Sequence, residues 1–365
     1  MIALIFAGAF GLAFSLFLTP VFAKMFRRMN LGQYIRADTP TSHQLKRGTP
    51  SMGGVVFIAA ATLGYFLAKL LSQQLPSVPA LLVIMMMVGL GLIGFLDDWL
   101  KVRRSNSLGL NHWFKILGQL IVGAAFAILA LGYQDSNGTT AATTAISLFR
   151  DLDFDFVVTF GVVLGIALFV VWIVLLTVSV SNAVNLTDGL DGLAGGASIF
   201  AIGSYIIIGF WQANQSCFNV NLDPAVMEKC YIVSSPLDLA VIAAAIVGAL
   251  VGFLWWNTSP AQIMMGDTGA LGLGGALTAL AVMSRTELLL VLLGGLFVWI
   301  TMTVIIQRIY FKATKGKRIW LSTPIHHHFE LKGWQEVTIV VRFWIIQGMC
   351  VALGVGLFYL EWTSI

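Results

Sequence analysis

Residues 157–180, VVTFGVVLGIALFVVWIVLLTVSV, form a long apolar run without a charged side chain. A helix needs about 20 apolar residues to cross the hydrocarbon core of a bilayer, so this run predicts a transmembrane helix. Nine similar runs flank it. Together they predict an all-α polytopic membrane protein with ten spans, at residues 1–26, 51–71, 79–97, 113–132, 157–180, 193–212, 238–256, 269–284, 288–309 and 339–360. The eighth run is short and opens with Gly-rich GALGLGGAL, so we expect it to be tilted or partly re-entrant.

The composition of the 365 residues supports the same class of protein. Apolar residues make up 58% of the chain and charged residues 10%, compared with about 25% charged in soluble domains. So little charge excludes a soluble globule and intrinsic disorder. Three cysteines exclude a disulfide scaffold and a Cys-rich zinc site. We expect a single integral membrane domain over residues 1–365, in contact with the lipid bilayer and without a nucleic-acid partner.

The basic residues predict the orientation of the spans. Segments 24–50, 97–115 and 308–342 hold 17 of the 21 Lys and Arg residues. Because cytoplasmic loops carry an excess of Lys and Arg, these three segments are expected inside and both termini outside. The four remaining basic residues then fall near the outer face: Lys69, Arg150, Lys229 and Arg285.

Two outer loops carry local signals. In segment 133–156, the turn sequence from Asp135 to Gly138 lies between short runs rich in Thr and β-branched residues, which predicts a small hairpin. Segment 213–237 contains Cys217 and Cys230. On an oxidising side of the membrane they are expected either to form a disulfide or to remain two free thiols, and both alternatives are open.

Acidic residues end several spans on the inner side. Asp97 and Asp98 close an otherwise apolar run. One interpretation is a solvated helix end in which Asp98 pairs with Lys101. The other is a site that binds Mg²⁺, neutralises phosphate or supplies a general base, which is favoured because carboxylates at a helix C-terminus oppose the helix dipole.

Two inner loops contain acids and amides but no Lys or Arg. In SNAVNLTDGLDGLA (181–194), polar residues recur every third position, which places neighbouring pairs on one face of a helix. In NTSPAQIMMGDTGA (257–270), Asp267 stands between two glycines. Such loops fit a hard cation such as Mg²⁺ or a hydrogen-bonding ligand. The alternative is that the acidic side chains cap the helices that follow.

Histidine and basic residues mark two further inner segments. The tract TPIHHHFE (323–330) holds three consecutive histidines, which point about 100° apart on a helix, so one metal ion cannot easily use all three. They can instead donate to phosphate or carboxylate, or form an interfacial polar loop. In HQLKRGTPSMGG (43–54), Lys46 or Arg47 offers a charge for phosphate, although the spacing is not that of a P-loop.

Five aspartates from three inner loops would repel one another unless a divalent cation and basic side chains joined them. This grouping predicts one site for an anionic phosphate ester, and its place at the membrane suggests a lipid as one substrate. The five are Asp97, Asp98, Asp188, Asp191 and Asp267.

Taken in order, FLDDWLK (95–101), NLTDGLDGLA (185–194), NTSPA (257–261) with MGDTGALGLGG (265–275), and PIHHHFE (324–330) resemble the polyprenyl-phosphate N-acetylhexosamine-1-phosphate transferase superfamily. The triple histidine followed by Phe-Glu is similar to its phospho-N-acetylmuramoyl-pentapeptide-transferase branch. The resemblance implies transfer of phospho-MurNAc-pentapeptide from UDP-MurNAc-pentapeptide to undecaprenyl phosphate, giving lipid I and UMP. This is the first membrane step of peptidoglycan synthesis. It also implies a Mg²⁺ cofactor, a homodimer, and a bacterial inner membrane location with the site facing the cytoplasm.

The same resemblance implies residue roles. Asp267 is expected to ligate Mg²⁺, Asp97 and Asp98 to handle the lipid phosphate or the metal with one of them as base, and His326 to be catalytic. The family often has an aromatic residue where this chain has Met264, which removes a stacking partner for uracil. The expected substrate-binding residues are Lys46, Ser51, Asn182, Asn185, Asp188, Gly189, Leu190, Asp191, Asn257, Met264, Gln307, His327 and His328.

Three other functions compete with this interpretation. A sibling transferase would use UDP-GlcNAc or another sugar nucleotide, against which the triple histidine argues. A secondary transporter would keep its ionisable residues near the membrane midplane, whereas here they collect at one face. A structural scaffold gives no reason for five aspartates on one face.

Overall fold

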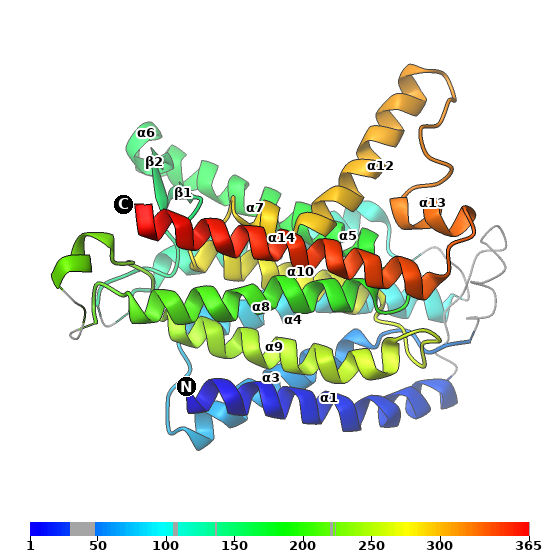
Figure 1. Cartoon of the computed structure of the whole chain (residues 1–365), viewed down its shortest axis with the longest axis horizontal. Coiled ribbons are helices and arrows are strands. Elements are labelled where there is room, and N and C mark those ends of the chain that lie inside the picture. The colour runs from blue at the N-terminus through cyan, green and yellow to red at the C-terminus, as the bar shows by residue number, and fades with distance from the viewer. Residues whose placement is uncertain (30–47, 105–108, 136, 220–221, 223, 365) are drawn as a thin grey trace.

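The computed structural model describes residues 1–29, 48–104, 109–135, 137–219, 222 and 224–364 (Figure 1). Within this part of the chain the protein is mostly helical, and ten helices are long and apolar enough to cross a membrane. The predicted all-α fold with ten spans is confirmed. The spans are α1 (Ile2–Arg28), α3 (Gly54–Leu71), α4 (Val78–Arg103), α5 (His112–Gly132), α7 (Val162–Thr187), α8 (Leu193–Asn214), α9 (Pro236–Asn257), α10 (Gly266–Met283), α12 (Gly295–Ala313) and α14 (Glu336–Ser364).

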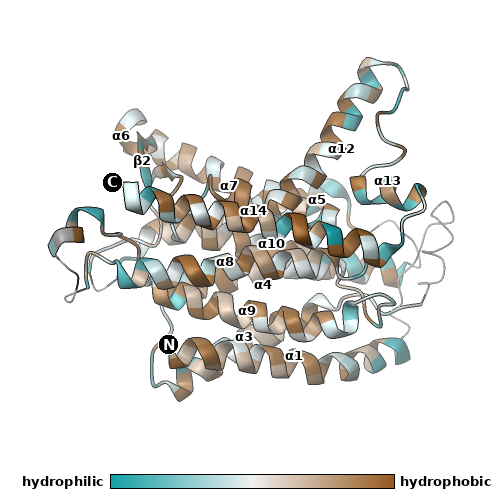
Figure 2. Cartoon of the chain, viewed as in Figure 1, coloured by the Kyte–Doolittle hydropathy of each residue, from teal (hydrophilic) through white to brown (hydrophobic). Residues whose placement is uncertain are grey.

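The long helices run roughly alongside one another, and both chain termini lie at the same end of the bundle (Figure 1). We call this the terminus end and the opposite one the site end. Apolar residues cover the helices, whereas polar residues gather toward their ends and in the connections (Figure 2). The connections contain the shorter elements: β1 (Ala145–Ser147), β2 (Asp151–Asp155), α6 (Phe156–Phe160), a 3-10 turn (Pro224–Lys229), α11 (Leu290–Leu293) and α13 (Ile325–Leu331).

Two spans extend further than their apolar runs. Helix α4 continues past Asp97 to Arg103, and α7 continues through Asn182 and Asn185 to Thr187. The helices continue because the polar side chains in these last turns find partners on neighbouring helices. Asp97 and Asp98 are therefore interior residues of α4, whereas the apolar pattern placed them at the end of the helix.

The ninth apolar run, 288–309, is not one helix. It is divided into α11 and α12, which meet at Gly294, and α12 leans away from the bundle (Figure 1). Two consecutive glycines, Gly294 and Gly295, stand at the division, and glycine is among the poorest helix formers. The break gives α12 a different direction from its neighbours (Figure 1).

Helix α10 is the centre of the bundle and is continuous, so the expectation of a partly re-entrant segment was wrong. Its apolar window is 89% buried, more than that of any other described span, and it packs against α3, α4 and α7. Its glycines permit close approach: a Cβ at Gly275 would stand 2.6 Å from the carbonyl oxygen of Met86. The Gly-rich sequence therefore serves tight helix packing, as small residues commonly do in membranes.

The terminus end contains the predicted hairpin and a disulfide. Strands β1 and β2 pair antiparallel, with Ser147 opposite Asp151, so the chain reverses at residues 148–150. The turn at Asp135–Gly138 closes a separate single bridge between Gln134 and Thr140. Of the two alternatives for the cysteines, the disulfide Cys217–Cys230 is the one observed.

The contact between α1 and α9 depends on a missing side chain at Gly248. A Cβ there would overlap the carbonyl group of Gly8, with only 2.8 Å to its carbon. We expect Gly248→Ala to destabilise the protein by about 1–3 kcal/mol, the usual cost of overpacking, as measured by thermal unfolding in detergent. Gly203→Ala in α8 is the matched control, because no described residue outside its own helix turn lies within 4 Å of that Cβ. Equal melting temperatures for the two variants would contradict the close packing.

Candidate active site

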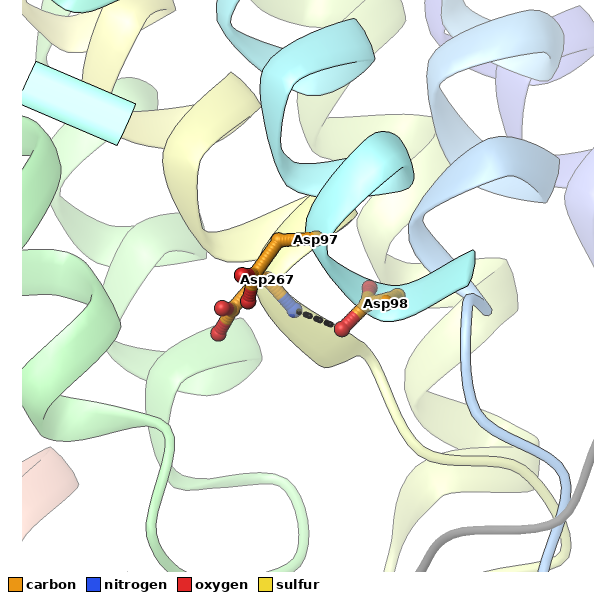
Figure 3. Close-up of side chains that lie close together, drawn as sticks. All are labelled: Asp97, Asp98 and Asp267. Carbon is orange, nitrogen blue, oxygen red and sulfur yellow. Dashed lines mark hydrogen bonds between the residues drawn. The ribbon is translucent and has the colours of Figure 1, made fainter. Parts of the chain in front are cut away.

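Three carboxylates meet at the site end of the bundle. Helix α4 supplies Asp97 and Asp98, and the first turn of α10 supplies Asp267 (Figure 3). One oxygen of each lies within 4.8 Å of the others. Asp97 and Asp98 are only 3% and 5% exposed, so the interpretation of a solvated helix end was wrong. Three like charges this close require a cation among them.

Asp98 fastens α10 to α4. Its Oδ1 accepts a hydrogen bond from the backbone nitrogen of Asp267 (3.2 Å, dashed in Figure 3), and its Oδ2 accepts from the nitrogen (3.0 Å) and hydroxyl (2.8 Å) of Thr268. A carboxylate is favourable at a helix N-terminus, where backbone N–H groups lack partners. The capping residue of α10 is thus Asp98 from another helix, whereas the alternative that Asp267 caps its own helix is not observed.

Two lysines neutralise the cluster. Lys101 Nζ lies 2.6 Å from Asp97 Oδ2, 2.9 Å from Asp267 Oδ2 and 3.9 Å from Asp98 Oδ1. Lys115 Nζ, from α5, lies 2.8 Å from the same Asp267 oxygen. The ammonium group of Lys101 therefore contacts all three carboxylates. A cation bound by the same three carboxylates would occupy a neighbouring position.

Helix α7 contributes amides. Asn185 Nδ2 donates to the second oxygen of Asp267 at 2.6 Å. One turn earlier, Asn182 Nδ2 donates to Gln119 Oε1 at 3.1 Å. The spacing of three correctly predicted that Asn182 and Asn185 lie on one face of a helix. The helix, and with it this spacing, ends at Thr187.

Asp188 lies just beyond α7 and is electrostatically linked to the cluster. Burial, together with the negative charges of Asp267 and Asp98, raises the pKa of its carboxyl to about 8. At pH 7 the Asp188 carboxyl is therefore mostly protonated when no added cation is present. A divalent cation nearby would favour the ionised form.

The three histidines have three different environments on α13. His326 is fully buried and its ring rests on Gly189, where a Cβ would come within 3.0 Å of the ring Cε1. His327 Nδ1 pairs with Glu330 Oε2 at 2.6 Å, and His328 Nδ1 accepts from the backbone nitrogen of Leu321 at 3.1 Å. The three rings therefore have different partners, and the contact of His326 with Gly189 brings the aspartate and histidine motifs together.

Several predicted substrate-binding residues join the loops of the site. Asn257 Oδ1 accepts from Gly192 N at 3.1 Å, and Asp191 Oδ2 accepts from Ala261 N at 3.0 Å. Helix α8 begins after Gly192 without a side-chain cap, so the capping alternative for Asp191 is not observed. Leu190 is buried in the same loop.

The loop before α3 lies beside the loop before α10. Gly53 N donates to the carbonyl oxygen of Met264, and Met264 N donates to that of Pro50, both at 2.8 Å. Ser51, between them, is buried. This pairing brings the predicted residues Ser51 and Met264 to the same edge of the site. Lys46 lies outside the described residues.

A basic cavity of about 450 Å³ lies between α12 and the segment leading to α13. Arg308, Lys312 and Arg318 line it beside Gln307. The Gln307 side chain holds the cavity wall in place, because its Oε1 accepts from Ile319 N and its Nε2 donates to Trp320 O, both at 2.9 Å. Sequence analysis had treated these basic residues only as marks of orientation.

An apolar groove of about 220 Å³ opens between α7, α10, α11 and α12. Its lining includes Val180 and Ala183 from α7, Leu277 from α10, and Val298 from α12. Ala183 lies in the same turn of α7 as Asn185, which donates a hydrogen bond to Asp267 of the carboxylate cluster. The groove lies where α12 diverges from the other helices.

Sequence analysis missed four polar residues of the cluster. Lys101 was considered only as a surface partner of Asp98, although its position three and four residues after the two aspartates is a signal. Lys115 and Gln119 share one face of α5 by their spacing of four. Thr268, which binds Asp98, has no signal beyond its neighbour Asp267.

Two family models match parts of the chain. The family model described as "Glycosyl transferase family 4" matches residues 80–285, and "Phospho-N-acetylmuramoyl-pentapeptide-transferase signature 1" matches residues 46–58. The first match covers more than half of the chain and contains all three clustered aspartates.

Relatives match this chain over nearly their full length. The chain is 63% identical to the phospho-N-acetylmuramoyl-pentapeptide-transferase of Clavibacter michiganensis subsp. michiganensis, over 100% of both chains. It is 55% identical to that of Kineococcus radiotolerans, over 100% of this chain and 99% of the relative. It is 53% identical to that of Streptomyces avermitilis, over 99% and 98%. The chain therefore belongs to the phospho-N-acetylmuramoyl-pentapeptide-transferase family.

Proposed function

We propose that this chain transfers phospho-MurNAc-pentapeptide from UDP-MurNAc-pentapeptide to undecaprenyl phosphate, giving lipid I and UMP. The names of its relatives support the reaction. The observation that carries the proposal is the cluster of three carboxylates and two ammonium groups, together with an apolar groove along α7, the helix that also supplies Asn185 to the cluster. A phosphate joined to a long hydrocarbon chain needs these two features side by side.

The site end is assigned to the cytoplasm and both termini to the outside of a bacterial inner membrane. Three segments that hold 17 of the 21 Lys and Arg residues connect helices at the site end, and such residues favour the cytoplasmic side. UDP-linked donors are water-soluble and would reach the site from that side. The chain acts as one integral membrane domain over residues 1–365, in a homodimer.

Bringing two phosphorylated substrates together is mainly a problem of charge and alignment. Asp97, Asp98 and Asp267 offer the hard oxygen ligands that Mg²⁺ prefers. When bound, Mg²⁺ would neutralise phosphate charge as the phosphoryl group is transferred. Lys101 and Lys115 hold Asp267 in place and supply positive charge for phosphate oxygens.

The hydrogen bonds suggest different roles for the two adjacent aspartates. Asp98 uses both oxygens to hold the start of α10, so it positions Asp267 in addition to offering a ligand oxygen. Asp97 faces Lys101 and is assigned to the lipid phosphate. Little proton removal is needed there, because a phosphate monoester has its second pKa near 6. His326, buried against Gly189, is placed on the donor side of the site.

The donor and acceptor occupy different surfaces. The lipid chain lies in the apolar groove, with its phosphate near Asn185 and Asp267. The nucleoside diphosphate contacts the loops that contain Asp188, Leu190 and Asn257, and the basic cavity beside Gln307 and His327 receives the sugar and peptide. Met264 packs against the uracil through its thioether, without aromatic stacking.

The deciding experiment measures UMP release by the purified full chain in detergent, with undecaprenyl phosphate and Mg²⁺. UDP-MurNAc-pentapeptide and UDP-GlcNAc are supplied in parallel reactions. We expect release with the pentapeptide donor alone. Release with UDP-GlcNAc alone would indicate the sibling activity, and no release from folded protein would overturn the transferase proposal and favour transport.

Asp267→Asn should lower the rate of UMP release at least about 100-fold, because the amide removes one negative ligand and leaves two ammonium groups without their shared partner. Asp153→Asn, on the exposed strand β2, is the matched control and should retain full rate. Chelation of divalent cations should reproduce the loss in the unchanged chain, and added Mg²⁺ should restore the rate. Full activity of Asp267→Asn, or no effect of the chelator, would refute the metal assignment.

Filling the groove should affect the lipid substrate selectively. Val298 lines the groove and is 37% exposed. Val298→Trp should raise the KM for undecaprenyl phosphate about tenfold, equivalent to about 1.4 kcal/mol, and leave the KM for the nucleotide donor unchanged. Val251→Trp, at a similarly exposed position of α9 outside the groove, is the control. Equal effects of both substitutions would show that the lipid chain lies elsewhere.

A further inference from the structure

A second polar cavity lies at the terminus end, away from the carboxylate cluster. It measures about 200 Å³ and is lined by the hairpin turn, the segment after the disulfide and the connection between α10 and α11. A water molecule takes about 30 Å³ in the liquid, so the cavity has room for several waters or a tetrahedral anion. Two of the four outer basic residues, Arg150 and Arg285, face it together with Asp151 and Tyr231.

Arg285 is buried yet makes few of its hydrogen bonds. It is 4% exposed and carries five N–H donors, but within the described residues its side chain makes one hydrogen bond, from Nη2 to the carbonyl oxygen of Thr140 at 3.2 Å. Its Nε has no acceptor in the same part of the chain, and the nearest carboxylate oxygen, of Asp151, is 3.9 Å away. A buried donor without a partner indicates a missing ligand or solvent.

The backbone conformation of Arg285 and the charges around it are also unusual. Arg285 has a φ of +56°, a conformation that side chains other than glycine rarely adopt. Burial lowers the pKa of its guanidinium. The neighbouring Glu287, which accepts two hydrogen bonds from Ser147, has its pKa raised to about 7 by burial. Near neutral pH Glu287 is therefore only about half ionised and compensates Arg285 incompletely.

Arg150 is held at the rim with its remaining N–H groups available. Its Nε donates to Glu361 at 2.8 Å, its Nη1 to the carbonyl oxygen of Cys230 at 2.7 Å, and its Nη2 to the carbonyl oxygen of Lys229 at 2.5 Å. Its Cζ lies 4.1 Å from the centroid of the Tyr231 ring. These contacts fix the guanidinium fork without using all five donors. A rigid pair of guanidinium groups matches the geometry of phosphate oxygens.

We propose that this cavity is a phosphate-type oxyanion site, in which Arg285 is the buried donor and Arg150 the donor at the rim. Asp151 at the rim opposes an anion and sets a limit on the affinity. The shared chemistry is a phosphate group, which can come from the headgroup of an anionic phospholipid at the ends of the spans or from free phosphate in solution. This site is separate from the transfer reaction and does not depend on its assignment.

The test measures thermal unfolding of the purified full chain in two series. One series titrates inorganic phosphate into detergent solution, with chloride at matched ionic strength as the reference. The other compares nanodiscs of phosphatidylcholine with nanodiscs that also contain phosphatidylglycerol. A ligand that binds the folded state raises the melting temperature by mass action. Stabilisation in the first series identifies free phosphate as a ligand, and stabilisation in the second alone identifies the lipid headgroup.

Three variants distinguish the cavity from general charge effects. Arg285→Gln should raise the half-saturating concentration at least about tenfold, as expected for the loss of a charged hydrogen bond. Lys229→Gln removes an outer positive charge outside the cavity and should bind as the unchanged chain does. Asp151→Asn removes the opposing carboxylate and should strengthen binding about threefold or more. This gain cannot arise from misfolding.

Absence of stabilisation by either probe in the unchanged chain would overturn the proposal. Equal responses of Arg285→Gln and Lys229→Gln would also overturn it. If Arg285→Gln does not fold, Asp151→Asn decides: tighter binding supports the site, and unchanged binding refutes it.

Discussion

The arrangement depends on three carboxylates that are held within 4.8 Å of one another in a largely apolar bundle. Such a group is stable only when cations and hydrogen-bond donors surround it, and removal of one partner from a buried ion pair typically costs about 3–5 kcal/mol. The partners come from different helices: Lys101 from α4, Lys115 from α5 and Asn185 from α7. Charge balance at this point therefore fixes how four helices meet.

The position of α10 links this charge balance to the apolar fold. Its N-terminus is bound by Asp98, and the rest of the helix is buried between α3, α4 and α7. Glycines allow these helices to approach closely, while the polar first turn faces the site. A small shift of α10 would separate Asp267 from both lysines. The most buried helix of the protein is thus also the one that carries a central site residue.

Much of this structure follows from the sequence. The long apolar runs predicted ten spans because the bilayer sets a common length for helices. The repeated aspartates predicted a shared site because isolated acids at span ends are costly. The hairpin was predicted from the wrong turn: Asp135 binds the backbone of Asn137 and Thr139 locally, and the strands reverse at residues 148–150 instead.

Other features depend on contacts between distant segments and could not be read from local patterns. Asp98 caps α10 although it lies 168 positions before the start of that helix in sequence. This contact can be predicted only when α4 and α10 are known to be neighbours. The burial of His326 on Gly189 joins two motifs far apart in the chain. The break at Gly294 was hidden because α11 and α12 are both apolar, so hydropathy alone merges them.

The place of Lys101 has a consequence for how the protein responds to its surroundings. Its ammonium group is a cation attached to the chain, and it already contacts all three carboxylates. A divalent ion that enters the cluster must compete with the Lys101 ammonium group for the carboxylates. The ammonium group is always present because it is part of the chain. The fraction of clusters that hold a divalent ion would then depend on the concentration of that ion in the surrounding solution. Lys101 would keep the cluster neutralised if such an ion left, so the fold does not depend on a bound ion.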